Sequence, residues 1–413
     1  MFSRRSFLST SAAIAFGSTI RAAEPARKKI AVVTNIWNYH SHAWHMAERF
    51  LHGYPIKGKW HHPPFEVVAA YVDQKPEGDL SAGRAKEFGF KIYATVEEAI
   101  RRGGDKLAVD AVLVIGEHGN YPKNDFGQIQ YPRYQYFKKI TDVYRKDGRT
   151  APIFNDKHLS WKFEWAKEMV DTSRELKFGF CAGSSLPVTW RMPAIDMPFG
   201  AEVEEAMCVA FGGLDVYDFH ALETIQCMVE RRRGGETGVV AVQAFRGDAV
   251  WKALESGAWG KGLLETCLAR SQTLAQAPSL SHRYPTFDQM KTWVKEPVAY
   301  RIEYADGLKA TMLLLNGLVQ DFTFAARLKG KSDPLSTLFH LPPNPNVTYS
   351  AALMSKAEET FVTNHSPTPI DRTLLTSGLT AAGLRSLSEG KRLETPHLAV
   401  KYQVGKESLF ARE

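Results

Sequence analysis

Cysteine is scarce in this chain, with four in 413 residues. They are Cys181, Cys208, Cys227 and Cys267, and no two of them form the C-x-x-C spacing of thiolate metal sites. Cys208 and Cys227 fall within apolar segments, where a free cysteine behaves as a small buried hydrophobe. We therefore predict buried free thiols and no thiolate metal centre.

A long apolar run and a strong excess of one charge are also missing. After the N-terminus, no segment approaches the ~20 apolar residues that a membrane-spanning helix needs. The formal charge is +7, but the basic residues form no stripe with interleaved aromatic side chains, so we expect no nucleic-acid partner. A hydrophobic content of 44% over this length is enough for two domains.

The N-terminus has the pattern of an export signal. Residues 3–8 read SRRSFL, and an apolar stretch follows over residues 12–20. The paired arginines and the short apolar region resemble a twin-arginine signal, so we assign residues 1–26 to it and predict an exported, periplasmic protein. Arg21 stands where a small residue is expected before a cut after Ala23. The alternatives are therefore a retained segment that anchors the protein to the membrane, or an N-terminus with no targeting role.

Residues 27–183 alternate between apolar runs and helical periodicity. The runs at residues 30–33, 65–72, 109–115, 152–154 and 178–181 suit buried parallel strands, with helical segments between them. This alternation predicts an α/β domain with a Rossmann-like, doubly wound parallel sheet.

Residues 184–413 have a different texture. Residues 201–211 and 239–245 read as strands, and residues 299–304 and 308–315 flank the turn Ala305-Asp306-Gly307 as a β-hairpin. Helical patterns lie between these strands and follow them. We predict an α+β domain with a largely antiparallel sheet; the family resemblance described below further implies that this sheet is open-faced and carries substrate and subunit contacts. The C-terminal tail of this domain is a candidate to pack back on the first domain.

The turn after the first strand contains no glycine. A dinucleotide site of the usual kind carries G-x-G-x-x-G there, because glycine lets the backbone approach the pyrophosphate. Bulky and polar side chains stand in its place, among them Asn35, Trp37 and His42. We take these three residues as candidates to bind a cofactor, although the pyrophosphate would be poorly accommodated.

Polar residues also follow the other predicted strands. Asp73 ends the second main strand, where an acid commonly binds the ribose of a nucleotide, and a helix-capping or surface role is the alternative. Glu117 and His118 follow the next strand and are further cofactor candidates. The candidates for substrate binding are Tyr121, Asn124, Arg133, Asn155 and Arg191.

Histidines cluster in the first turn. His40, His42 and His45 could converge with His118 at the sheet edge, and imidazoles with a carboxylate suit zinc or manganese. Histidines near a helix start also often bond backbone or line a sugar pocket. We favour that second interpretation and assign no metal.

The order of elements resembles the Gfo/Idh/MocA oxidoreductase family, and the resemblance covers nearly all of the chain after the signal. It rests on the two-domain layout, the strand at 109–115, the segment Asp156-Lys157-His158, the helix with His220, and the ending SPTPIDRTLLTSGLTAAGL. Lys157 takes the place of the lysine in the family's E-K-P motif, whose glutamate and proline are absent here. His220 matches the family's histidine, and Asp218 lies near the place of its aspartate.

The resemblance implies NAD or NADP in the first domain, and oxidation or reduction of a sugar or cyclitol with Lys157, His220 and Asp218 as the catalytic residues. It also implies a homo-oligomer. The glycine-free turn keeps two alternatives open. One is a relative without hydride transfer, such as a lyase, hydrolase or epimerase on carbohydrate, with or without a metal. The other is a non-catalytic exported protein that binds sugar.

Overall fold

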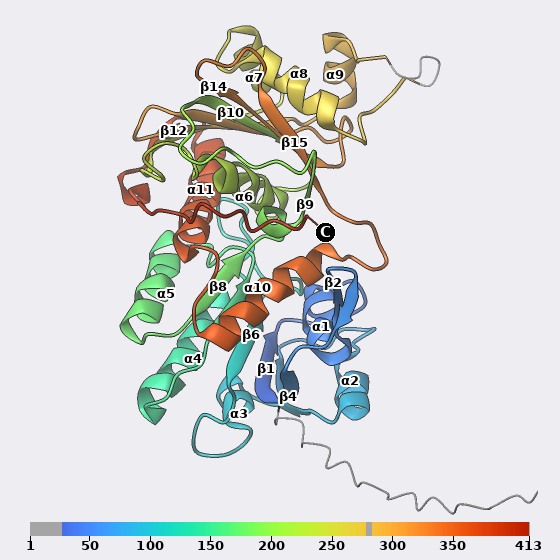
Figure 1. The fold of residues 1–413 in the computed structure, drawn as a ribbon, viewed down its shortest axis with the longest axis vertical. Helices are drawn as coiled ribbons and strands as arrows, with labels where there is room; N and C mark the ends of the chain where they lie inside the picture. The colour runs from blue at the N-terminus through green and yellow to red at the C-terminus, as the bar shows by residue number, and fades with distance from the viewer. Residues whose placement is uncertain (1–26, 278–282, 413) are drawn as a thin grey trace, which may run out of the picture.

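The protein is described by a computed structural model that covers residues 27–277 and 283–412. The predicted signal segment, residues 1–26, lies outside the described residues. The N-terminal strands and helices build one domain, and the later strands build a second sheet above it (Figure 1).

A six-stranded sheet organises the N-terminal domain, in the order β5-β4-β1-β6-β7-β8, and every pair of neighbours is parallel. Its strands are β1 (Lys28–Thr34), β4 (Phe65–Val72), β5 (Lys91–Tyr93), β6 (Ala111–Ile115), β7 (Ile153–Asp156) and β8 (Phe180–Gly183). Strand β6 is buried along its whole length, as its continuous apolar sequence predicts. The strand order reverses between β1 and β6, so ligands are expected at the carboxyl edge beside this pair.

Helices cover both faces of this sheet. They are α2 (Ser81–Phe88), α3 (Val96–Arg101), α4 (Arg133–Asp147) and α5 (Phe163–Glu175). Helix α3 begins where the sequence predicts, because the Thr95 side chain accepts a hydrogen bond from the Glu98 amide. Helix α4 ends at Gly148, whose φ of 68° is the left-handed conformation typical of a C-terminal glycine.

The first helix of this domain is irregular. It starts as a π-helical turn, Ala43–Ala47, and continues as a short α-helix, α1 (Glu48–His52). A small antiparallel hairpin follows, formed by β2 (Tyr54–Ile56) and β3 (Lys59–His61) within the His-Pro-rich loop. π-Helical turns are frequent at functional sites, and this one adjoins the turn where a phosphate loop would lie.

An eight-stranded sheet organises the C-terminal domain, in the order β16-β11-β12-β13-β10-β14-β15-β9. Its strands are β9 (Trp190–Met192), β10 (Val203–Ala210), β11 (Val239–Arg246), β12 (Val298–Tyr304), β13 (Lys309–Leu314), β14 (Phe322–Leu328), β15 (Leu335–His340) and β16 (Leu393–Glu394). Only the pair β10 and β13 is parallel among these described strands. The predicted hairpin is present as β12 and β13, and the predicted α+β fold with a largely antiparallel sheet is confirmed.

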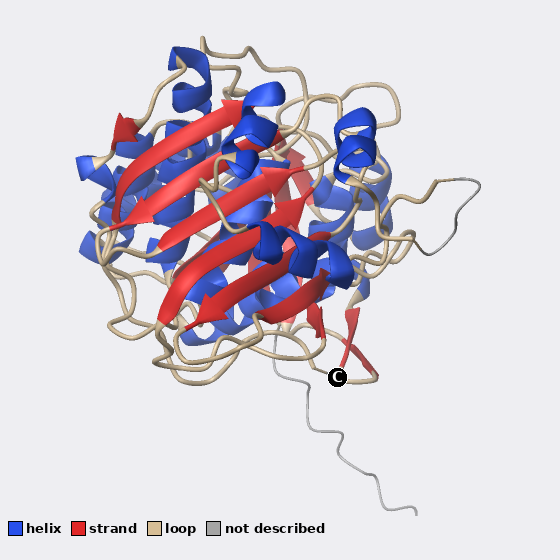
Figure 2. Cartoon of the chain, turned by 90° about the horizontal axis from the view of Figure 1, so that it is seen from above, coloured by secondary structure: helices blue, strands red, loops and turns tan. Residues whose placement is uncertain are grey.

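Two layers of helices pack on the second sheet. Helices α6 (Tyr217–Val229) and α11 (Ile370–Glu389) lie between this sheet and the N-terminal domain. On the opposite face are α7 (Asp248–Glu255), α8 (Lys261–Arg270) and α9 (Phe287–Trp293), seen in front of the strands in Figure 2. An apolar cluster that includes Trp251, Leu264 and Cys267 joins these helices to the strands, so part of the face predicted to be open is covered.

Two late helices return to the N-terminal domain. Helix α10 (Tyr349–Thr363) packs on the face of the parallel sheet that carries α1, where Met354 and Phe361 join the same apolar cluster as Phe50. Helix α11 packs against α5 and β8 as well as α6 and β11. Helices from the late part of the sequence therefore cover part of the N-terminal sheet.

All four cysteines are buried and free, as predicted. In the part of the chain that the structure describes, no helix has the length and apolar character needed to cross a membrane.

Candidate active site

Lys157 lies at the carboxyl edge of the parallel sheet, directly after β7. Its side chain is buried, and its φ of 59° places the backbone in the left-handed region, which is uncommon for a residue other than glycine. Asn155 shapes this turn, because its side-chain amide donates to the backbone oxygens of Asp156 at 3.2 Å and His158 at 3.3 Å. Asn155 thus positions Lys157, whereas the sequence predicted that it binds substrate.

The buried carboxylate of Glu117 forms an ion pair with Lys157. The Lys157 Nζ lies 3.4 Å from Glu117 Oε1, and Arg133 donates to the other Glu117 oxygen. Burial alone would raise the pKa of Glu117, but Lys157 and Arg133 hold it below its usual value. Gly116 leaves room for the arginine, since a Cβ there would lie 2.5 Å from Arg133 Cγ. Glu117 and Arg133 are therefore the ionic support of Lys157.

His42, at the start of the π-helical turn, pairs with a carboxylate. Its Nδ1 lies 2.6 Å from Asp156 Oδ2, and Asp156 is fully buried. Burial, together with the positive charge of Lys157, lowers the pKa of His42 well below its usual value. Burial and the nearby Glu117 raise the pKa of Asp156 to about 6. At neutral pH the pair is a neutral imidazole beside an ionised carboxylate.

His220 approaches the same region from helix α6 of the second domain. Its Nδ1 lies 2.6 Å from Ser184 Oγ. Burial, Lys157 and His42 each lower the pKa of His220, so this imidazole is neutral and lies within electrostatic reach of both groups. The structure thus brings together Lys157, His42 and His220, of which the sequence predicted the first and third as catalytic.

Asp218 lies away from this centre. Its carboxylate accepts hydrogen bonds from the Tyr300 hydroxyl at 3.0 Å and the Phe219 amide at 2.8 Å, within the core of the second domain. The residue that reaches toward the site is Asp215, which has a φ of 66° and whose Oδ1 lies 3.8 Å from His158 Nε2. Burial and the neighbouring Asp218 raise the pKa of Asp215 to about 7.

Three of the metal candidates are close together. The ring centroids of His42 and His45 lie 4.6 Å apart, and those of His42 and His118 lie 5.0 Å apart. His40 turns away and stacks on Trp44 at 5.2 Å. Among the described residues, no group of three or more histidine, cysteine, aspartate or glutamate side chains is arranged to hold a metal ion.

Asp73, the candidate ribose ligand, is engaged by two tyrosines. The Tyr71 hydroxyl donates to Oδ1 at 2.5 Å, and the Tyr121 hydroxyl donates to Oδ2 at 2.6 Å. Tyr121 was predicted to bind substrate. It instead ties the loop after β6 to the end of β4, together with Gln74, whose side chain bonds the Asn120 amide at 2.9 Å.

The turn after β1 is packed into the protein. Trp37 is fully buried, stacks on Phe90 at 5.7 Å and donates to Glu48 at 3.2 Å. The Asn35 side chain donates to the His118 backbone oxygen at 3.0 Å and accepts from the Tyr136 hydroxyl. Asn35 and Trp37 therefore serve the packing of the turn.

These contacts show whether a dinucleotide could bind at the carboxyl edge of the parallel sheet, where it usually lies in this kind of fold. The pyrophosphate would need an open backbone cradle where Trp37 and Asn35 pack, and each Asp73 oxygen that a ribose would bind already accepts one tyrosine hydroxyl. The loops after β1, β4 and β6 are also hydrogen-bonded to one another across this crevice. In this arrangement the residues do not fit a dinucleotide bound in the usual way.

Two other candidate substrate ligands lie elsewhere. Asn124 closes its own loop, where its Oδ1 accepts from the Phe126 and Gln128 amides at 3.0 Å. Arg191 is buried in the second domain, pairs with Asp196 at 2.7 Å and lies over the Phe339 ring. Neither contacts Lys157 or the two histidines in the described structure.

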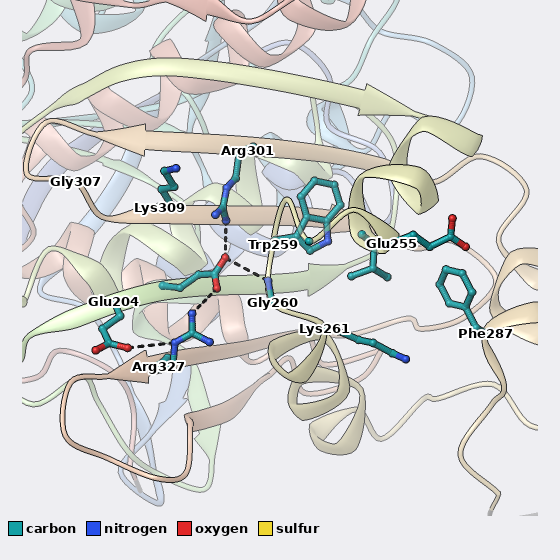
Figure 3. Close-up of a pocket in the computed structure, with 13 residues that line it drawn as sticks. Glu204, Glu255, Trp259, Gly260, Lys261, Phe287, Arg301, Gly307, Lys309 and Arg327 are labelled. Carbon is teal, nitrogen blue, oxygen red and sulfur yellow. Dashed lines mark hydrogen bonds and ion pairs between the residues drawn. The ribbon is translucent and has the colours of Figure 1, made fainter.

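A cavity of about 810 Å³ lies far from Lys157, between the outer face of the second sheet and helices α7 to α9 (Figure 3). At its base, the Glu205 carboxylate pairs with Arg301 at 2.8 Å and Arg327 at 2.9 Å. Because Glu205 satisfies both arginines, they are not available as a pair for an anionic ligand.

Sequence reasoning missed Asp156, Asp215 and Ser184 as parts of the site. Asp156 adjoins Lys157, and that adjacency was a usable signal. Asp215 and Ser184 carried none, because their contacts to His158 and His220 join distant parts of the chain.

Comparison with solved structures supports the fold. GenD2 from gentamicin A biosynthesis, in complex with NAD, matches 90% of this chain and 97% of its own at 12% identity and a TM-score of 0.57. The myo-inositol 2-dehydrogenase of Lactobacillus plantarum matches 89% and 99% at 10% identity and a TM-score of 0.52. The myo-inositol dehydrogenase of Lactobacillus casei, in complex with NAD(H) and myo-inositol, matches 89% and 96% at 12% identity and a TM-score of 0.52.

No protein-family model matches the chain, and no curated protein matches it in sequence. The shared feature with the solved structures is therefore the fold. This chain shares the two-domain fold of these solved structures, with a candidate active site at the edge where the two domains meet.

Proposed function

We propose that the protein is an enzyme that acts on a sugar, cyclitol or related carbohydrate at an alcohol or carbonyl group, with Lys157 as the central acid/base. The observation that carries this proposal is the buried Lys157, held in a left-handed backbone conformation beside Glu117 and within electrostatic reach of His42 and His220. Backbone strain and shifted titrations of this kind cluster at active sites. They argue against a protein that only binds sugar.

The first candidate chemistry is that of an NAD(P)-dependent oxidoreductase. The fold favours it, because the L. casei neighbour holds NAD(H) and myo-inositol and the GenD2 neighbour holds NAD. In this reaction Lys157 and His220 would move the proton of the substrate hydroxyl. The nicotinamide cofactor would supply the hydride chemistry, but it would first require the contacts around Asp73 and Trp37 to open.

The second candidate chemistry moves protons without a nucleotide, as a lyase, hydrolase or epimerase does. The contacts of Asp73 with Tyr71 and Tyr121 favour it, because they occupy the group that a ribose would need. We further propose that the protein is exported to the periplasm by the segment at residues 1–26, and that it assembles as a homo-oligomer. Size-exclusion chromatography with light scattering tests the assembly.

Nucleotide content distinguishes the two candidates. The chain without residues 1–26 is purified, denatured and analysed by mass spectrometry for NAD and NADP, and thermal stabilisation by added nucleotide is measured. Stoichiometric nucleotide, with reduction of NAD(P) on adding inositols or sugars, supports the oxidoreductase. Asp73→Asn serves as the matched variant, since it weakens nucleotide binding only if Asp73 holds the ribose.

If no nucleotide binds, the second candidate is favoured, and carbohydrates are screened for non-redox conversion. The proposed function is wrong if no carbohydrate stabilises the protein and the protein converts none, with or without nucleotide.

A further inference from the structure

His42 and Asp156 form a pair that the candidate chemistry above does not use. His42 belongs to the turn after β1, and Asp156 ends β7, so the contact spans the sheet edge across the β6 strand. Asp156 Oδ1 has no hydrogen-bond partner among the described residues, and the His42 contact engages Oδ2 at 2.6 Å. Such a carboxylate fixes the imidazole with its Nδ1 proton inward, which leaves Nε2 as the basic atom.

The surroundings of His42 keep it neutral. The charged and titratable groups that act on it are Lys157, Glu117, His118 and Arg133, and His45 adjoins it on the same turn. Burial is the largest cause of the lowered pKa of His42, and Lys157, His118 and Arg133 add to it against the opposite effect of Glu117. A neutral imidazole beside a protonated amine is the arrangement that proton removal next to a carbonyl requires, because the base takes the proton and the cation stabilises the oxyanion.

His220 completes the arrangement from the other domain. It is the second neutral imidazole within electrostatic reach of Lys157, and its Nδ1 contact with Ser184 fixes its ring. His220 therefore brings a second polar group, from the other domain, to the site that holds Lys157 and His42.

We propose that the site binds a carbonyl-bearing sugar or cyclitol and catalyses a proton transfer that needs no nucleotide, with His42, oriented by Asp156, as the base. His42 Nε2 takes the proton from the carbon next to the carbonyl, and the C–H electron pair moves to give an enolate whose oxygen is stabilised by Lys157. The His42 imidazolium formed in this step returns the proton to the former carbonyl carbon of the enolate while a proton passes between the two substrate oxygens, so His42 is neutral again at the end. Atoms and electrons balance with no oxidant or reductant, and the net result is an isomerisation.

This inference rests on the proposed function and goes further, since it names the substrate class and the base. It agrees with the packing of Trp37, which fills the place where the pyrophosphate of a dinucleotide usually lies. Asp156 acts through His42 and is a positioning residue.

Deuterium exchange tests the proposal. The chain without residues 1–26, freed of any nucleotide, is incubated in D₂O with keto- and aldo-sugars and with a ketocyclitol, and NMR follows deuterium entering the carbon next to the carbonyl. We expect catalysed exchange that falls by 10²-fold or more in His42→Asn. His52→Asn is the matched control, because His52 follows on the same helical segment, is 45% exposed, and should leave exchange unchanged.

The variant Asp156→Asn tests whether Asp156 orients the His42 ring. In the native protein we expect exchange to slow as the pH falls and Asp156 protonates, and in Asp156→Asn we expect slower exchange without this dependence on pH. Circular dichroism establishes that each variant is folded.

Three results overturn the inference: no exchange by the native protein with any of these substrates, unchanged exchange in His42→Asn, or conversion that occurs only with added NAD(P). The last result leaves the proposed function standing as an oxidoreductase. Absence of any binding or conversion of carbohydrate would overturn both.

Discussion

Residues with left-handed backbone gather around the candidate site. His118, Lys157 and Asp215 all have positive φ values, between 59° and 66°. Each such residue costs about 1–3 kcal/mol unless its surroundings compensate, and such strain concentrates where function requires a particular side-chain direction. Here the compensation is visible in the Asn155 hydrogen bonds around the Lys157 turn.

Lys157→Ala should abolish turnover while leaving the fold intact. The substitution removes the ammonium group beside Glu117, and Arg133 still pairs with that carboxylate. We expect a loss of 10²-fold or more in kcat, measured on a carbohydrate that the screens described above show to be converted. Lys177→Ala is the control, since Lys177 is exposed and has the same backbone conformation, with a φ of 57°. Full activity in Lys157→Ala would contradict the assignment.

Individual site residues were predictable only where the chain carried a local signal. Lys157 and His220 were accessible through the resemblance of their segments, and Glu117 through its place after an apolar strand. The role of Arg133 was not, because its target Glu117 lies across a loop whose course the sequence does not specify. Asp73 was predicted at the right strand end, but its two tyrosine partners depend on side-chain directions.

At the scale of elements, the sequence predicted most of the long strands and helices, but it missed the strand β15 and the helix α9. β6 and the β12–β13 hairpin follow directly from apolar runs and a turn of Asp-Gly type. The short strands β9 and β16 were not predicted, because two or three residues carry too little periodicity and their pairing is tertiary. The sequence also did not predict where α10 packs, because this depends on a face of the parallel sheet, whose strands lie far from α10 in the sequence.

One buried ion pair joins the two long helices α6 and α11. Arg372 on α11 donates to both oxygens of Glu230, at the end of α6, and both residues are buried. Arg372→Met leaves this carboxylate without its cation, so we expect a loss of about 3–5 kcal/mol of unfolding free energy in denaturant titration.

A control pair between α5 and the same helix α11 makes this prediction specific. Arg174 pairs with Asp371 of α11 at 2.6 Å, but its side chain is 54% exposed. Arg174→Met should therefore cost no more than about 1 kcal/mol. The double variant Arg372→Met with Glu230→Met should recover part of the loss, and equal costs for the two arginine variants would refute the argument.

At the scale of the whole molecule, Asp215 links the domains. Its Oδ2 accepts from the Ile129 amide at 2.7 Å, and its Oδ1 faces His158. Burial and Asp218 raise its pKa to about 7, above the value of an unfolded aspartate. Its contribution to stability is therefore present at low pH and is lost as the pH rises through about 7.

Asp215→Asn should consequently stabilise the protein at pH 8, because it removes a buried charge. We expect the midpoint temperature of thermal unfolding to rise by about 2 °C or more at pH 8 and to stay unchanged at pH 5. The exposed Asp142→Asn on α4 should show no such dependence on pH. A gain of the same size at both pH values would show that Asp215 is not charged in the folded protein at pH 8.

The return of α10 and α11 to the first domain affects how the chain folds during synthesis. Residues 349–389 leave the ribosome among the last, yet their apolar side chains cover the parallel sheet. Until then, part of the parallel sheet is uncovered although α1 already packs on it, and exposed apolar surface invites aggregation. Nascent chains that stall before residue 349 should therefore depend on chaperones, while complete chains should not.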